Sequence, residues 1–227
     1  MNYNIKIGHI YPDLLDMYGD KGNIASLSKR LIWRGMGAEI VSFKKNDTLN
    51  LEDVDILLIG GGDDTALEKA LTLLSNYKKE LKNYVEDGGV LLALCGAFPM
   101  LGKNMLDILN IYTEKSEKRF TGNVVIENEE LGSIVGFENH KEKTYIGNLS
   151  PLGKVVKGFG NCGDGMEGVI YKNTFATFLH GPLLPKNPHL ADEIIKRALE
   201  KKYGGEISLP PLDDSLENDA HKSALSL

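Results

Sequence analysis

Short apolar runs recur at intervals along the first part of the chain. The runs "VDILLIGGGDD" (54–64) and "VLLAL" (90–94) contain continuous apolar residues, a pattern typical of strands that are buried on both faces of a sheet. The runs "NIKIGHI" (4–10) and "AEIVSF" (38–43) are rich in β-branched residues and predict two further strands. Four strands are therefore expected before residue 95.

The stretches between these strands have helical spacing. Ile24, Leu27 and Leu31 recur every three or four residues, and we expect Asn23 to cap the helix that they form. A second helix is predicted from Thr65, as its cap, to about Glu86. A repeated strand–helix–strand order implies a mostly parallel sheet covered by helices on both faces, so the predicted fold class is α/β.

The pattern changes between Arg119 and Phe178, where short alternating runs are separated by glycine and asparagine. These runs predict antiparallel strands that are added to the parallel sheet or packed beside it. Residues 189–205 then have the spacing of an amphipathic helix. We expect one domain over residues 1–204 and a polar, loosely ordered tail over residues 205–227, because the tail contains a proline pair and few apolar residues.

The charge balance disfavours several classes of function. The chain has 26 Lys and Arg residues against 32 Asp and Glu, a net charge of -6, and no basic cluster, so no nucleic-acid partner is expected. No apolar stretch approaches the roughly 20 residues that span a bilayer, and the N-terminus lacks the pattern of a secretion signal. These features predict a cytoplasmic protein whose ligand is a small neutral or anionic metabolite.

The two cysteines differ in context, and their spacing fits no zinc site, so no metal is expected. Cys95 follows a buried strand, at the end of the sheet where α/β proteins bind ligands, and a sharp turn there holds a nucleophile exposed. The N-terminus of the following helix favours a thiolate. From the strand alone, a packed core thiol is the competing interpretation. Cys162 lies in a glycine-rich loop, and we assign it no catalytic role.

His180 is the best candidate for a general base to a cysteine nucleophile. It ends the β-rich run "ATFLH" and is followed by the turn residues Gly181 and Pro182. The other four histidines fit structural or surface positions better; these are His9, His140, His189 and His221. Spacing alone does not establish that Cys95 and His180 meet.

Six stretches, in order, resemble the cobyric-acid-synthase-like members of the class I (triad-type) glutamine amidotransferases. They are "YPDLLDMYGDKGNIASLSKR" (11–30), "ILLIGGGDD" (56–64), "LLALCGAFPMLG" (91–102), "RFTGNVVIE" (119–127), "VGFENHKEKTYI" (135–146) and "FLHGPLLPKNP" (178–188). The resemblance implies a flavodoxin-like glutaminase domain. In it, Cys95 attacks the side-chain amide of L-glutamine to form a thioester, and His180 activates the thiol.

Three further site residues follow from the same resemblance. Arg119 corresponds to the arginine that binds substrate, and a guanidinium suits the α-carboxylate of glutamine because it can bind both oxygens. Gly62 and Gly96 correspond to the positions whose backbone N–H groups form the oxyanion hole. Removing one such donor typically lowers the rate by about 10²–10³-fold.

The chain has no G-x-x-x-x-G-K-[ST] loop, so no cofactor is expected in it. The resemblance is strongest to family members that form a heterodimer with a MurT-like, Mur-ligase-type synthetase. That partner binds ATP and Mg and uses the ammonia to convert D-glutamate of lipid II to D-isoglutamine during peptidoglycan synthesis. Three alternatives remain: a cobyrinate-type or other acceptor, a catalytically vestigial interaction subunit, and a non-enzymatic protein in which Cys95 senses redox state. Cobyrinate-type enzymes usually carry their own synthetase domain, for which 227 residues leave no room.

The sequence departs from the family pattern at three positions. Pro182 stands where many relatives carry the glutamate that orients the histidine, so His180 must be oriented by a backbone carbonyl, by a residue elsewhere in the chain or by a carboxylate of the partner. Ala97 replaces a glycine, which matters if the backbone there needs a positive φ. Pro99 replaces a glutamine that helps to hold substrate.

Overall fold

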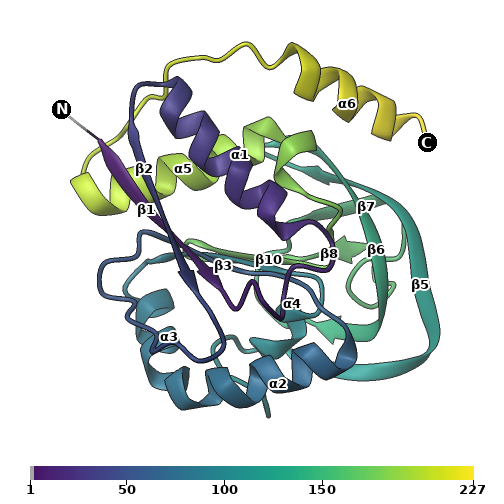
Figure 1. The fold of residues 1–227 in the computed structure, drawn as a ribbon. Coiled ribbons are helices and arrows are strands. Elements are labelled where there is room, and N and C mark those ends of the chain that lie inside the picture. The colour runs from purple at the N-terminus through teal and green to yellow at the C-terminus, as the bar shows by residue number, and fades with distance from the viewer. Residues whose placement is uncertain (1–2) are drawn as a thin grey trace.

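The structure is a computed structural model, and it describes residues 3–227. A six-stranded sheet forms its centre (Figure 1), and its neighbouring strands are parallel except for the last pair. In spatial order the strands are β2 (Gly37–Phe43), β1 (Asn4–Ile10), β3 (Ile56–Ile59), β4 (Val90–Leu94), β10 (Thr174–Thr177) and β9 (Val169–Tyr171). The four strands expected before residue 95 are all present.

Helices cover both faces of this sheet, as the α/β pattern predicts. Alternate residues of β1, β3 and β4 contribute to two separate apolar clusters, one on each face. One cluster contains α1 (Asp20–Trp33) and α5 (Pro188–Tyr203); the other contains α2 (Asp64–Leu74), α3 (Lys78–Glu86) and the short α4 (Ala97–Met100). Strands β3 and β4 are fully buried, which explains why their sequences are continuously apolar.

A second sheet packs beside the first, and its strands are antiparallel (Figure 1). Its order is β6 (Gly132–Tyr145), β5 (Tyr112–Asn128), β7 (Gly153–Lys157) and β8 (Met166–Glu167). The antiparallel strands predicted after Arg119 are therefore confirmed for this sheet. Strand β10 differs, because it joins the main sheet parallel to β4, with Thr177 opposite Leu94.

Two predicted helix starts are wrong. Helix α1 begins at Asp20, after Gly19 in the left-handed conformation (φ 81), and Asn23 lies within it. The Asn23 side chain instead accepts the N–H of Leu184 at 2.8 Å. The second helix is capped by Asp63, which accepts the N–H of Ala66 at 2.8 Å, and it is interrupted by a 3-10 turn, η1 (Ser75–Tyr77), between α2 and α3.

The C-terminal segment differs from the loosely ordered tail that its polarity predicts. Residues Ser215–Leu225 form helix α6, which packs against β6 and the 3-10 turn η2 (Leu184–Lys186). A buried cation holds the segment that leads into α6: Arg30 of α1 bonds to Asp192 at 2.7 Å and to Asp214 at 2.9 Å. A buried guanidinium requires paired carboxylates, and one of them comes from the segment that leads into α6. Among residues 3–227, no helix is both long and apolar enough to cross a membrane.

Candidate active site

Cys95 occupies a strained turn at the carboxyl end of β4. Its φ is 53, in the left-handed region that non-glycine residues rarely adopt, and α4 starts two residues later. The backbone N–H of Cys95 donates to the carbonyl of Thr177 at 2.8 Å, which fixes the turn to the end of β10. Strained residues concentrate at functional sites, so this conformation favours the nucleophile over the packed core thiol.

His180 lies three residues beyond β10, the strand whose Thr177 accepts the N–H of Cys95. Its ring stacks on Tyr18 with centroids 4.2 Å apart and planes at 23°, and its backbone N–H donates to the carbonyl of Phe137 at 3.0 Å. Both ring nitrogens are buried, and neither has a hydrogen-bond partner within residues 3–227. The imidazole therefore has no hydrogen bond to the Cys95 thiol here, as is common before substrate binds.

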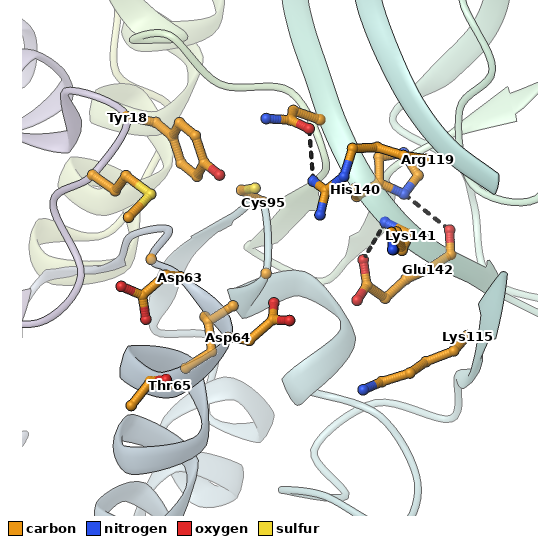
Figure 2. Close-up of a pocket in the computed structure, with 15 residues that line it drawn as sticks. Tyr18, Asp63, Asp64, Thr65, Cys95, Lys115, Arg119, His140, Lys141 and Glu142 are labelled. Atoms are coloured by element: carbon orange, nitrogen blue, oxygen red, sulfur yellow. Dashed lines mark hydrogen bonds between the residues drawn. The ribbon is translucent and has the colours of Figure 1, made fainter. Parts of the chain in front are cut away.

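A cavity of about 410 Å³ opens in front of Cys95 (Figure 2). Four of the five predicted site residues line it: Cys95, Gly96, Gly62 and Arg119. The fifth, His180, is not among the lining residues, because the Tyr18 ring stacks on it and itself faces the cavity. Small-molecule sites commonly measure about 300–1,000 Å³, so the cavity suits an amino acid.

Arg119 projects into this cavity from β5, across from Cys95 (Figure 2). Its Nη1 donates to Oδ1 of Asn139 on the neighbouring strand β6 at 2.8 Å. That bond holds one edge of the guanidinium and leaves its other donors for a ligand. The position fits a group that binds the carboxylate of an amino acid whose side chain reaches Cys95.

Burial keeps the cysteine and the histidine uncharged at rest. It raises the pKa of the Cys95 thiol to about 12, although the backbone N–H of Gly96 counteracts part of this rise. Burial also lowers the pKa of His180 to about 4, with smaller contributions from His140 and Lys186 in the same direction. At neutral pH the resting pair is therefore a thiol and a neutral imidazole, which is able to accept a proton.

The three departures from the family pattern each have a place in the structure. Ala97 is not among the residues with positive φ, because the left-handed position is Cys95 itself, and Ala97 starts α4 as a buried residue. Pro99 lies within α4 and is also buried. Pro182 packs against Gly22 of α1, where a methyl group added to the glycine would lie 2.7 Å from the proline ring.

His140 was not predicted as a site residue, because its polar sequence context fits a structural or surface position. His140 is 3% exposed, lines the cavity and stacks on Phe178 with centroids 3.7 Å apart. Its Nδ1 lies 2.9 Å from the carbonyl of Glu142, and its Nε2 lies 3.4 Å from Glu138. The alternation of Glu138 and His140 along one strand places both on one face, and this was the available signal. Among the described residues, no cluster of three His, Cys, Asp or Glu side chains offers a metal site.

Comparison with known proteins identifies the family. Residues 6–188 match the CobB/CobQ-like glutamine amidotransferase domain. The chain belongs to this family. Two relatives are each described as the glutamine-hydrolysing subunit GatD of lipid II isoglutaminyl synthase. The relative from Staphylococcus aureus is 37% identical over 98% of this chain and 93% of its own length. The relative from Streptococcus pneumoniae is 36% identical over 96% and 89%.

A solved structure agrees with this assignment at the level of the fold. A crystal structure of a glutamine amidotransferase superposes with a TM-score of 0.58 at 22% identity, covering 85% of this chain and 98% of the other. The class I glutamine amidotransferase-like fold and the resemblance of the six motifs are thus confirmed. As a CobB/CobQ-like glutamine amidotransferase, the chain places Cys95 where the parallel strands end, as α/β folds place their ligands.

Proposed function

We propose that this chain hydrolyses L-glutamine to glutamate and ammonia as the glutaminase subunit of a two-subunit ligase. The observation that carries the proposal is the strained Cys95 turn, which lines the same cavity as Arg119. Tyr18 also lines this cavity, and His180 stacks on the Tyr18 ring. An uncharged imidazole suits a base that takes the proton of the nucleophile once substrate binding brings the two groups together. No other described cysteine has this setting, since Cys162 lies in a loop away from the cavity.

The geometry supports a sequence of four steps. The Cys95 sulfur attacks the side-chain carbonyl carbon of glutamine while His180 accepts the thiol proton. The carbonyl oxygen becomes an oxyanion that takes hydrogen bonds from the N–H groups of Gly62 and Gly96, both of which line the cavity. The C–N bond breaks, and His180 returns the proton to the departing ammonia. Water then hydrolyses the thioester, which releases glutamate and restores the thiol.

Arg119 positions the substrate for this attack. Its guanidinium pairs with the α-carboxylate of glutamine, at the opposite end of the molecule from the reacting amide. The Cys95 N–H is already bonded to Thr177, so it is unavailable to the oxyanion, and the donor next to the nucleophile is the N–H of Gly96. Nucleophile, oxyanion donor and carboxylate clamp thus converge on one cavity.

The proposal assigns the third catalytic group to the partner. Pro182 stands at the usual position of the acid. If a backbone carbonyl or a side chain of this chain oriented His180, it would lie within hydrogen-bond distance of the His180 ring. Neither ring nitrogen has such a partner within the described residues. This favours a carboxylate from the partner subunit over the other two options.

The two GatD relatives support a proposal for the acceptor and for the partner. Their description names lipid II isoglutaminyl synthase, and we propose the same assignment for this chain. The partner is then a MurT-like, Mur-ligase-type synthetase that carries ATP and Mg, activates the D-glutamate carboxyl of lipid II and receives the ammonia. The heterodimer works in the cytoplasm, where ATP is available.

Copurification from the native cell, followed by a glutamate-release assay, tests this assignment. A Mur-ligase-type protein should copurify, and the pair should hydrolyse glutamine. Cys95→Ala and His180→Ala should both abolish that activity, whereas the matched variant Cys162→Ala should retain it. Glutamate release that survives in His180→Ala contradicts the mechanism, and a pair without glutaminase activity supports the vestigial-subunit alternative. If the isolated chain hydrolyses glutamine as fast as the pair, the partner carboxylate is ruled out.

A further inference from the structure

Asp20, the first residue of α1, is a buried carboxylate to which the proposed mechanism gives no role. Its side chain is 1% exposed, although it starts a surface helix. Its Oδ2 accepts the backbone N–H of Gly61 at 3.0 Å, while its Oδ1 is buried without a hydrogen-bond partner in residues 3–227. Burying a carboxylate in this way is unfavourable, so a purely structural position would more readily hold a neutral residue.

The bond to Gly61 fixes the loop that carries a proposed oxyanion donor. Asp20 holds the N–H of Gly61, and the N–H of Met17 donates to the carbonyl of the same glycine at 3.3 Å. The described residues contain no cis peptide bond, so in the peptide between Gly61 and Gly62 the N–H points opposite to the carbonyl. The N–H and the carbonyl of Gly61 are therefore both held by hydrogen bonds. Because the Gly62 N–H points opposite to that carbonyl, its direction is fixed as well.

The close packing around Asp20 leaves this loop little freedom. A methyl group added at Gly60 would lie 2.6 Å from Cγ of Asp20 and 2.5 Å from the carbonyl oxygen of Leu15. At Gly61 it would lie 3.0 Å from Cβ of Cys95. The glycines are thus required by space, since the loop is enclosed between the segment before α1 and the nucleophile.

We propose that Asp20 is a positioning residue, which orients the Gly61–Gly62 peptide so that the Gly62 N–H faces the oxyanion of the reacting amide. The inference rests on the proposed glutaminase function. Asp20 does not line the cavity and therefore acts through the loop rather than on the substrate. The bond spans 41 positions of sequence, so it couples the start of α1 to the end of β3.

Three substitutions at Asp20 separate this role from general damage. Asp20→Asn keeps an oxygen that accepts the Gly61 N–H, Asp20→Ala removes it, and Asp20→Ser is compatible with a helix start but its hydroxyl is too short to reach. The control Asp13→Ala removes a carboxyl group from the segment before α1, at an exposed residue whose side chain accepts the backbone N–H of Lys45 at 3.1 Å. All are assayed in the full chain, together with its copurified partner.

Removal of an oxyanion donor lowers kcat by about 10²–10³-fold, and we expect a loss of roughly 10²-fold in Asp20→Ala and Asp20→Ser. The KM for glutamine should change by less than about three-fold, because Arg119 still binds the carboxylate. Asp20→Asn and Asp13→Ala should retain most of kcat. The rate of Cys95 alkylation by iodoacetamide, followed by mass spectrometry of its peptide, should be unchanged in all four, since displacement of iodide forms no oxyanion.

Normal kcat in both Asp20→Ala and Asp20→Ser overturns the inference. So does Asp20→Asn that is as inactive as Asp20→Ala, because the charge rather than the hydrogen bond would then matter. A parallel loss of alkylation in Asp20→Ala shows a general disturbance of the Cys95 turn and also overturns it. Failure of the proposed function is recognised separately: the wild-type pair would then release no glutamate, or Cys95→Ala would still release it.

Discussion

A methyl group at Gly61 should disable the site without replacing any side chain that is proposed to react. The added carbon in Gly61→Ala would lie 2.7 Å from Cδ2 of Tyr18 and 3.0 Å from Cβ of Cys95. Carbon atoms in contact are about 3.5–4.0 Å apart, so Tyr18 or the Cys95 turn must move by roughly 1 Å. Tyr18 is the more mobile of the two, because it is partly exposed and the turn is fixed to Thr177.

Movement of Tyr18 also displaces His180, because the two rings are stacked at 4.2 Å. A misplacement of about 1 Å in a catalytic group lowers the rate by on the order of 10²-fold, so we expect kcat/KM to fall by roughly that factor. Forcing a carbon into a filled core also lowers the free energy of unfolding by about 1–3 kcal/mol. Both quantities are measurable, the first by glutamate release and the second by urea denaturation.

A double-mutant cycle with Tyr18→Ala tests the cause. Removing the ring removes the closer of the two contacts, so Gly61→Ala in the Tyr18→Ala background should lower kcat/KM by no more than about three-fold. Gly122→Ala is the matched control, because no atom lies within 4 Å of a methyl group there. Additive effects of the two substitutions, or a fully active Gly61→Ala, would refute the idea that this packing aligns His180.

Three further predictions concern other parts of the molecule. Arg119→Ala should raise the KM for glutamine by roughly 10–100-fold, because a charge-assisted hydrogen bond contributes about 1.5–3 kcal/mol, and Lys118→Ala should not. Burial raises the pKa of Glu167 to about 8 from 4.5, so the folded state keeps a proton that the unfolded chain releases between these values. The free energy of unfolding should therefore fall as pH rises from 4.5 to about 8. Urea denaturation at pH 5 and pH 8 should show a smaller fall in Glu167→Gln than in the wild type. Asp214→Ala should lower the free energy of unfolding by about 1–3 kcal/mol, because it leaves Arg30 with one carboxylate partner, whereas Asp219→Ala on the exposed face of α6 should change it by less than about 0.5 kcal/mol.

The main sheet was predictable because its central strands are buried on both faces. The continuous apolar runs of β3 and β4 have no other stable location in a chain of this composition. The break between α2 and α3 was not predictable from spacing, because apolar residues continue across Ser75–Tyr77 at intervals that also fit one helix. Helix α6 was missed for a different reason: the segment that leads into it is held by the pairing of Asp214 with Arg30, 184 positions away.

The candidate site divides in the same way. Cys95 and His180 follow strand ends, and parallel strands end at one edge of a sheet, so local pattern together with the family resemblance locates them. Tyr18 lies in the irregular segment before α1 and Asp20 is the first residue of that helix, and the sequence around them gives no sign of burial. Their contacts with His180 and Gly61 arise from the packing of that segment against two other loops, which a single sequence does not specify.

The protonation states link hydrolysis to the partner. Thioester formation requires the proton to move from Cys95 to His180, yet burial raises the pKa of the thiol and lowers that of the imidazole, so both oppose the transfer. The guanidinium of Arg119 acts in the favourable direction on the thiol, but among residues 3–227 no carboxylate pairs with the imidazole. A carboxylate supplied by the synthetase would raise the pKa of His180 and stabilise the imidazolium. In the proposed heterodimer, the absence of an acid at Pro182 would therefore make ammonia release depend on the subunit that is proposed to consume the ammonia.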